Sequence, residues 1–210
     1  MDYVKPVSQI NLRDYDCVVS LGNKCSTTSI LRKLNIYKES FPFDSIPTTP
    51  AHVLKYLKSQ DTFYPQKDNI NTKDGIWFGH FNVTNEHQKT IEMFKRRFER
   101  LFKLLKSKKK ILFVYSAEGD MYNELNNRCN DNYNELLNIR NFITNTYKYD
   151  NFTIAAIHTN KTFKNEKNIL NYTINVKDEF LSWDCSTKGE RTKDAYVTVL
   201  ERIFKDIFNV

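Results

Sequence analysis

The sequence predicts an α/β fold: a layered, mainly parallel or mixed sheet flanked by helices, as in Rossmann-like proteins. Segments 17–21, 111–115 and 153–157 are apolar runs rather than alternating patterns. Strands that helices cover on both faces have this composition, because neither face meets water. Helical patterns separate the runs along the chain, which is the order of strand–helix–strand units. We therefore expect about five strands, with 17–21 and 111–115 inside the sheet and almost wholly buried.

The individual elements follow from periodicity and from start and stop signals. The expected strands are 16–21, 76–83, 110–116, 152–158 and 171–176. The expected helices are 25–34, 50–59, 89–106, 121–146 with a break, and 192–208. Between them, segment 36–75 is irregular and rich in proline and aromatic residues. It is too long for a simple connection, so we expect a functional insertion or a cap.

Composition indicates one domain spanning residues 1–210. The 210 residues are 40% hydrophobic and 14% aromatic, enough for one substantial core, and no Pro/Gly/Ser-rich linker divides them. The N-terminus lacks a secretory signal pattern, and no apolar run approaches 18 residues, about the length that spans a membrane. We expect an intracellular, cytoplasmic protein without membrane contact. The Lys/Asn/Ile-rich composition is typical of an AT-rich genome, and a viral source would make this the host cytoplasm.

The cysteines indicate neither a metal site nor a disulfide framework. Cys17, Cys25, Cys129 and Cys185 form no Cys-x-x-Cys pair. Free thiols fit a reducing compartment. We expect no metal and no cofactor.

The net charge of +7 is concentrated on the expected helix 89–106. Its apolar positions repeat every three or four residues, so its Lys and Arg side chains, among them Arg96, Arg97, Arg100 and Lys103, are expected on a solvated outer face. No nucleic-acid-binding motif accompanies them. Nucleic acid is therefore expected only as a nonspecific partner, and a phosphate-containing ligand stays open as an alternative.

The segment from Tyr15 to Leu34 is the most informative for function. An apolar strand leads through the turn Gly22-Asn23 to Cys25, which opens a helix with Ile30 and Leu31 on its apolar face. Unpaired amides and the helix dipole favour an anion at a helix start. Cys25 is therefore the candidate nucleophile.

The same segment resembles a family of putative papain-like cysteine peptidases. The resemblance rests on Ser20-Leu-Gly-Asn-Lys-Cys25, Leu31-Arg32 and Phe41-Pro-Phe-Asp44. Looser matches at Phe78-Gly-His80, Phe94-Lys-Arg-Arg97 and 111–114 extend it over about residues 14–116. It implies a cysteine peptidase or a related thiol-dependent hydrolase or acyl transferase acting on a peptide or small molecule. It also implies a papain-like α+β fold, an alternative to the Rossmann-like sheet.

A cysteine hydrolase needs a base and a group that orients the base. Of the four histidines, we favour His80, because aromatic flanks indicate partial burial and the resemblance recurs there. His158, at the end of a strand, is the second choice. Asp44 is the candidate orienting carboxylate, with a helix cap or an ion pair to Arg32 as the structural alternative. Ser116, Glu118 and Asp120 follow the strand 111–115 at a sheet edge, where they form either a second cluster that faces Cys25 or, as is commoner, a simple strand-to-helix connection.

The alternative function is nucleotide or sugar-phosphate binding or group transfer by a Rossmann-like protein. The loop after the first strand is where such proteins bind phosphate on helix-start amides. Gly22, Asn23, Ser26 and Thr27 would then bind the ligand, and Cys25 would be a packed side chain. The glycine fingerprints of dinucleotide and P-loop proteins are absent from this segment.

Overall fold

The computed structural model describes residues 2–3, 8–67, 72–117, 132–175 and 187–210. Its sheet runs in the order β1-β5-β4-β3-β2. The strands are β1 (Asp2–Tyr3), β2 (Cys17–Ser20), β3 (Ile111–Ser116), β4 (Phe152–Thr159) and β5 (Ile169–Asn175). Strands β2 to β5 are parallel, and β1 pairs antiparallel with β5. The predicted α/β class with a mainly parallel sheet is confirmed, and the papain-like α+β alternative is not the fold observed.

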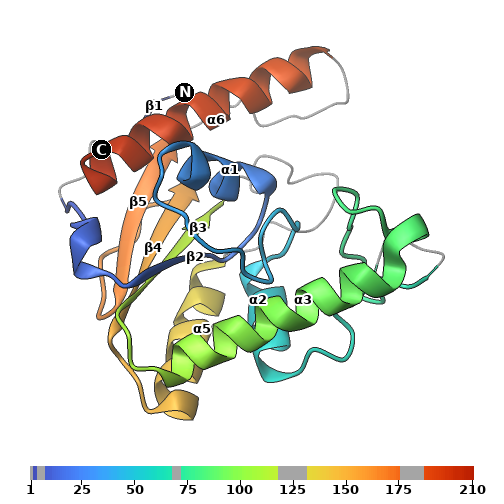
Figure 1. Ribbon diagram of the computed structural model, residues 1–210. Helices are drawn as coiled ribbons and strands as arrows, with labels where there is room; N and C mark the ends of the chain where they lie inside the picture. Colours follow the sequence, from blue (N-terminus) through green and yellow to red (C-terminus); the bar gives the residue numbers. More distant parts are fainter. Residues whose placement is uncertain (1, 4–7, 68–71, 118–131, 176–186) are drawn as a thin grey trace.

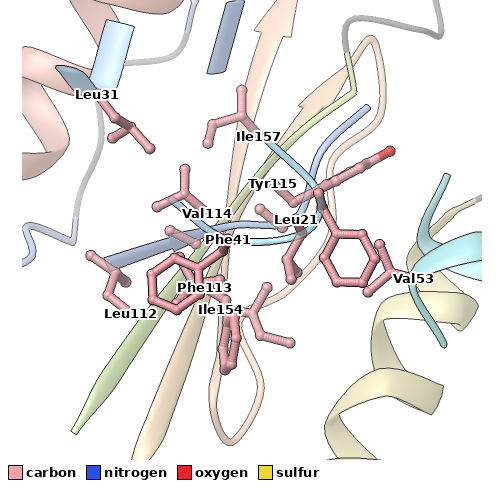
Figure 2. Packing of buried hydrophobic residues seen from close by; sticks show 14 of the residues in the cluster. Leu21, Leu31, Phe41, Val53, Leu112, Phe113, Val114, Tyr115, Ile154 and Ile157 are labelled. Carbon is pink, nitrogen blue, oxygen red and sulfur yellow. The ribbon is translucent and has the colours of Figure 1, made fainter. Parts of the chain in front are cut away.

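Helices lie on both faces of this sheet (Figure 1). They are α1 (Cys25–Lys33), α2 (Pro50–Lys58), α3 (Val83–Lys106), α5 (Asn132–Tyr147) and α6 (Thr187–Phe208), with a short 3-10 helix η1 (Leu12–Asp14) before β2. Helices α1 and α6 lie on one face, and α2, α3 and α5 lie on the other. Figure 2 shows how alternate residues of β3 serve the two layers: Val114 points toward Leu31 of α1, and Tyr115 points toward Val53 of α2. In the part of the chain described, every helix is too short or too polar to span a bilayer.

The two strands expected in the interior differ in position. Every residue of β3 is buried and β3 lies between β2 and β4, as predicted. The prediction for the first strand is wrong, because β2 is the last strand in the sheet order and Cys17 and Val18 are only half-buried. An apolar run predicts that a strand is buried, but it does not tell which segment of the chain covers the strand. Segment 43–48 covers the end of β2, where the Thr48 hydroxyl lies 3.5 Å from the Leu21 carbonyl oxygen.

The strand expected at 76–83 is also wrong. Residues 76–82 form a loop, and α3 begins at Val83 rather than at residue 89. Ile76 and Phe78 are buried whereas Trp77 and Gly79 are exposed, so the loop has the alternating burial of a strand. Its buried side chains enter the core beside α3: the ring centroids of Phe78 and Phe94 are 5.1 Å apart. Of the helix expected at 121–146, residues 121–131 lie outside the described residues.

Segment 36–75 contributes to the core. Phe41, Phe43, Ile46 and Phe63 are fully buried, and α2 forms the middle of the segment. The Phe63 ring lies 4.8 Å from that of Phe98 on α3. The buried apolar side chains described form one cluster that runs from Ile10 to Phe208.

Candidate functional site

Cys25 lies at the carboxyl end of β2, where the chain turns into α1. It is the first residue of α1 and is half-buried. The N-cap residue, Lys24, makes no side-chain capping hydrogen bond, since an ammonium group has no acceptor. The Cys25 thiol makes no hydrogen bond or ion pair to another described residue. A thiol and the amides of a helix start thus lie together at the edge where α/β proteins build their sites.

The turn before Cys25 requires its particular residues. Gly22 and Asn23 both have left-handed backbone angles, with φ of 83° and 77°. A Cβ atom on Gly22 would lie 2.0 Å from the Thr48 hydroxyl, so only glycine fits. The Asn23 side-chain amide donates to the Tyr115 hydroxyl at 3.2 Å, and the Gly22 amide donates to the Ser20 hydroxyl at 3.2 Å. The contacts of both residues build the turn that positions Cys25.

The hydroxyl groups after Cys25 are buried. Thr27 is fully buried, and its hydroxyl lies 2.6 Å from the equally buried hydroxyl of Ser116 on β3. Ser26 is also buried. The structure therefore brings Gly22, Asn23, Ser26 and Thr27 together around Cys25, and it places Ser116 at the same edge, as expected. Glu118 and Asp120 lie outside the described residues.

Asp44 is an anchor for the segment that follows α1. It is 1% exposed, and it accepts hydrogen bonds from the Tyr37 hydroxyl at 2.5 Å and from the Phe41 amide at 2.9 Å. Arg32 lies 3.7 Å away, which is the ion pair expected as the structural alternative. Burial raises the pKa of Asp44 and outweighs these contacts, which lower it. None of its contacts with described residues involves a histidine, so the structure does not join Asp44 to the candidate base.

The four histidines differ in how their rings are held. His52 caps α2 through Thr49, and His87 lies 3.0 Å from the Pro65 carbonyl oxygen. His158 is buried with Nε2 2.8 Å from Asn171 Oδ1. The partial burial expected for His80 is wrong, because His80 is exposed. Its ring lies 5.5 Å from that of Trp77, and it makes no hydrogen bond to another described residue. His80 is therefore the histidine whose two ring nitrogens make no hydrogen bond to another described residue.

Two features of this region were not predicted from the sequence. Tyr115 supports the turn through Asn23. Arg96, Arg100 and Lys103 are exposed, as expected, whereas Arg97 is half-buried. Arg100 also donates to the Ser40 carbonyl oxygen in the segment after α1, a contact that was not predicted. The order of residues along the helix gives no signal of this, because the contacts join residues far apart in the chain. Among the described residues, no group of three or more His, Cys, Asp or Glu side chains is arranged to hold a metal ion.

Comparison with known proteins gives one match. Searches of curated proteins and of solved structures find nothing similar. The looser resemblances at His80, at 94–97 and at 111–114 lie beyond the matched segment. Over residues 16–74, which contain the β2–α1 turn, Cys25 and Asp44, the chain matches the model of the expected family, described as putative papain-like cysteine peptidase (DUF1796).

Proposed function

We propose that the protein is a thiol-dependent hydrolase or acyl transferase in which Cys25 is the nucleophile. The observation that carries the proposal is the position of the thiol: it lies at the first residue of α1, half-buried, without a hydrogen bond to another described residue. A structural cysteine is usually inert because it is packed away from reactants. Cys17 is half-buried as well, but burial raises its pKa to about 11, which disfavours the reactive thiolate.

The proposed reaction is acyl transfer from a peptide or small-molecule substrate, through a thioester on Cys25, to water or another acceptor. The Cys25 thiolate attacks the carbonyl carbon, and the oxygen of the tetrahedral intermediate lies on the first-turn amides of α1. A base accepts the thiol proton and returns it to the leaving group. Water or another acceptor then attacks the thioester and releases the acyl group, which restores the thiol.

We assign the base to His80. The other three histidines hold Thr49, the Pro65 carbonyl and Asn171, so a change of protonation there would disturb a structural contact. The His80 ring makes no such contact with a described residue, and the neighbouring Trp77 is 43% exposed. Asp44 has a supporting role in this scheme: it fixes the turn after α1 and contacts α1 through Thr28, whose hydroxyl lies 3.5 Å away.

Alkylation of the folded protein tests this proposal. We expect iodoacetamide at neutral pH to modify Cys25 well before Cys17, with the modified peptides identified by mass spectrometry. Cys25→Ser should abolish the fast phase, and Cys17→Ser should leave it unchanged. His80→Gln should slow the alkylation of Cys25, whereas His52→Gln, the matched control, should not. Equal rates for Cys25 and Cys17, or the same rate after His80→Gln, would overturn the assignment.

A second candidate is binding of a phosphorylated ligand at the β2–α1 loop. The parallel sheet favours it, because helix-start amides at the carboxyl ends of parallel strands bind phosphate in such folds. In that case inorganic phosphate should protect Cys25 from alkylation, and Cys25→Ser should leave binding intact. A hydrolase without this ligand would show no protection.

A further inference from the structure

Three arginines from two helices gather around the segment that follows α1. This arginine cluster comprises Arg32 in the last turn of α1 and Arg97 and Arg100 on α3. Arg32 Nη2 donates to the Ser40 hydroxyl at 2.9 Å, and Arg100 Nη1 donates to the carbonyl oxygen of the same residue. Arg97 lies one helical turn before Arg100, and therefore on the same face of α3. Ser40 thus holds together two cations that are far apart in the sequence.

Arg97 is held in place without a full set of partners. It is half-buried, and its guanidinium carbon lies 4.9 Å from the ring centroid of Phe94 and 5.8 Å from that of Phe81. Its Nη1 atom is buried and has no hydrogen-bond partner among the described residues. Buried donors are nearly always paired, so an unpaired one indicates a ligand, an ion or a water that completes it.

The cluster has more positive charge than its surroundings neutralise. Among the described residues, Asp44 is the carboxylate within ion-pair distance of the cluster, 3.7 Å from Arg32. Its oxygens already accept from Tyr37 and the Phe41 amide. Burial lowers the pKa of Arg97, which Arg32 and Arg100 lower further and Asp44 and Tyr37 raise, so the three cations act on one another. One buried carboxylate thus interacts with Arg32 and Arg97, and Arg100 adds a third positive charge beside Arg97.

We propose that the arginine cluster binds the phosphate group of a small-molecule ligand. Guanidinium groups present paired N–H donors that match phosphate oxygens, and stacking on aromatic rings keeps the Arg97 fork oriented. A phosphate carries nearly two negative charges, which offsets the excess left by Asp44. A bound phosphate also supplies acceptors for the unpaired Arg97 nitrogen.

This site is separate from Cys25. Arg32 lies near the last residue of α1 and Cys25 is its first, which places them about 10 Å apart along the helix axis. The cluster also differs from the rest of the basic face of α3. Arg96 and Lys103 are exposed, as Arg32 and Arg100 are, but unlike these two they make no hydrogen bond to another described residue. They therefore provide controls with the same charge on the same helix.

Calorimetric titration with inorganic phosphate at constant ionic strength tests the proposal. We expect the wild-type protein to bind phosphate, and we expect Arg100→Gln to weaken binding by about ten-fold or more, the loss typical of a charge-assisted hydrogen bond. Arg96→Gln, which removes the same charge from α3 outside the cluster, should change the affinity by less than about two-fold. Arg97→Lys keeps the positive charge but removes the paired N–H donors of the guanidinium group. This variant should also weaken binding if paired donors hold the phosphate.

The remaining outcomes separate this site from the alternatives. No binding by a wild-type protein that is folded would overturn the proposal, as would equal losses in Arg100→Gln and Arg96→Gln, which would indicate diffuse attraction to α3. Binding that is insensitive to Arg100→Gln and Arg97→Lys, but that protects Cys25 from alkylation, would place the phosphate at the β2–α1 loop instead. Cys25→Ser should bind phosphate like the wild type, so failure of the hydrolase assignment leaves this test unaffected.

Discussion

Asp44 is a buried carboxylate whose contacts join the segment after α1 to α1 itself. It accepts hydrogen bonds from the Tyr37 hydroxyl and from the Phe41 amide, and it lies within ion-pair distance of Arg32. A buried carboxylate is tolerated only where its oxygens are satisfied, and loss of a partner leaves a buried group unpaired. Folding alone therefore gives a physical reason for its place in the matched segment.

We expect Asp44→Asn to destabilise the protein by about 1–3 kcal/mol, because the amide cannot satisfy Tyr37, Phe41 and Arg32 together. Denaturant unfolding measures this change. Asp61→Asn, at an exposed residue, should alter stability by less than about 0.5 kcal/mol. The alkylation rate of Cys25 in the folded variant should match that of the wild type. A slower rate with unchanged stability would instead indicate that Asp44 orients the base.

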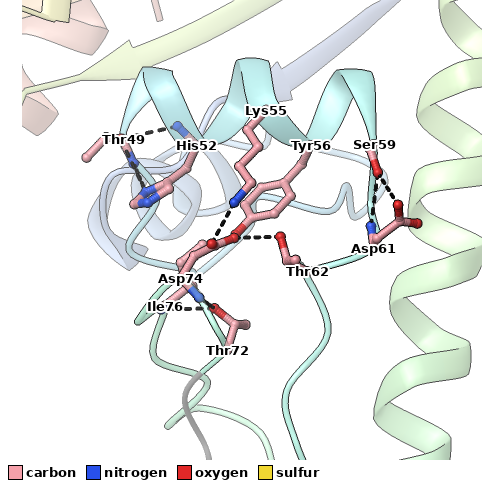
Figure 3. Close-up of polar contacts among 10 residues, drawn as sticks. All are labelled: Thr49, His52, Lys55, Tyr56, Ser59, Asp61, Thr62, Thr72, Asp74 and Ile76. Atoms are coloured by element: carbon pink, nitrogen blue, oxygen red, sulfur yellow. Dashed lines mark hydrogen bonds and ion pairs between the residues drawn. The ribbon is translucent and has the colours of Figure 1, made fainter.

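Helix α2 is tied at both ends to the irregular chain around it (Figure 3). At its start, Thr49 and His52 form a reciprocal capping box. Asp74 joins α2 to the later part of the segment: it accepts from Lys55 at 2.6 Å, from Tyr56 at 2.5 Å and from Thr62 at 2.7 Å. Burial raises the pKa of Asp74, but these hydrogen bonds outweigh burial and lower it to about 2.

Asp74 should make stability depend on pH in acid. Its folded pKa lies below the ordinary 3.8, so the charged group stabilises the fold above about pH 4, and this contribution is lost as the pH falls from about 4 to about 2. Asp74→Asn should therefore be less stable than the wild type near neutral pH. The difference in unfolding free energy should shrink toward about pH 2. A difference that stays constant over this range would contradict the assignment.

At the scale of the whole molecule, an aromatic cluster packs segment 36–75 against α3. Phe63 lies at its centre, fully buried, with the rings of Tyr56, Phe94 and Phe98 5.0, 5.3 and 4.8 Å away. Edge-on aromatic pairs add about 0.5–1.5 kcal/mol to the effect of burial. Segment 36–75 therefore shares the core of the sheet layers rather than resting on their surface.

We expect Phe63→Ala to destabilise the protein by about 3–5 kcal/mol, since it leaves a cavity in the core. Phe102→Ala, at a half-buried position on α3, should cost clearly less. Thermal unfolding followed by circular dichroism should show one transition that shifts as a whole. Two transitions, of which only one moves, would show that 36–75 is an independent cap.

The sequence by itself determined the parallel sheet and the cysteine at a helix start. These features depend on neighbours in the chain: the apolar run before Leu21, the glycine that the turn requires, and the periodicity of Ile30 and Leu31. The start of α2 was predicted for the same reason, since Thr49 and Pro50 are local signals.

Only the tertiary structure decided which segments cover one another. In the folded chain, β2 is an edge strand whose end is covered by residues 43–48, and residues 76–82 form a loop. Asp44 accepts a hydrogen bond from Tyr37 rather than from a histidine. The tertiary structure also brought Arg32 and Arg100 to the same serine. Burial and charge pairing are properties of the folded surface, where residues far apart in the chain become neighbours, so no periodicity in the chain specifies them.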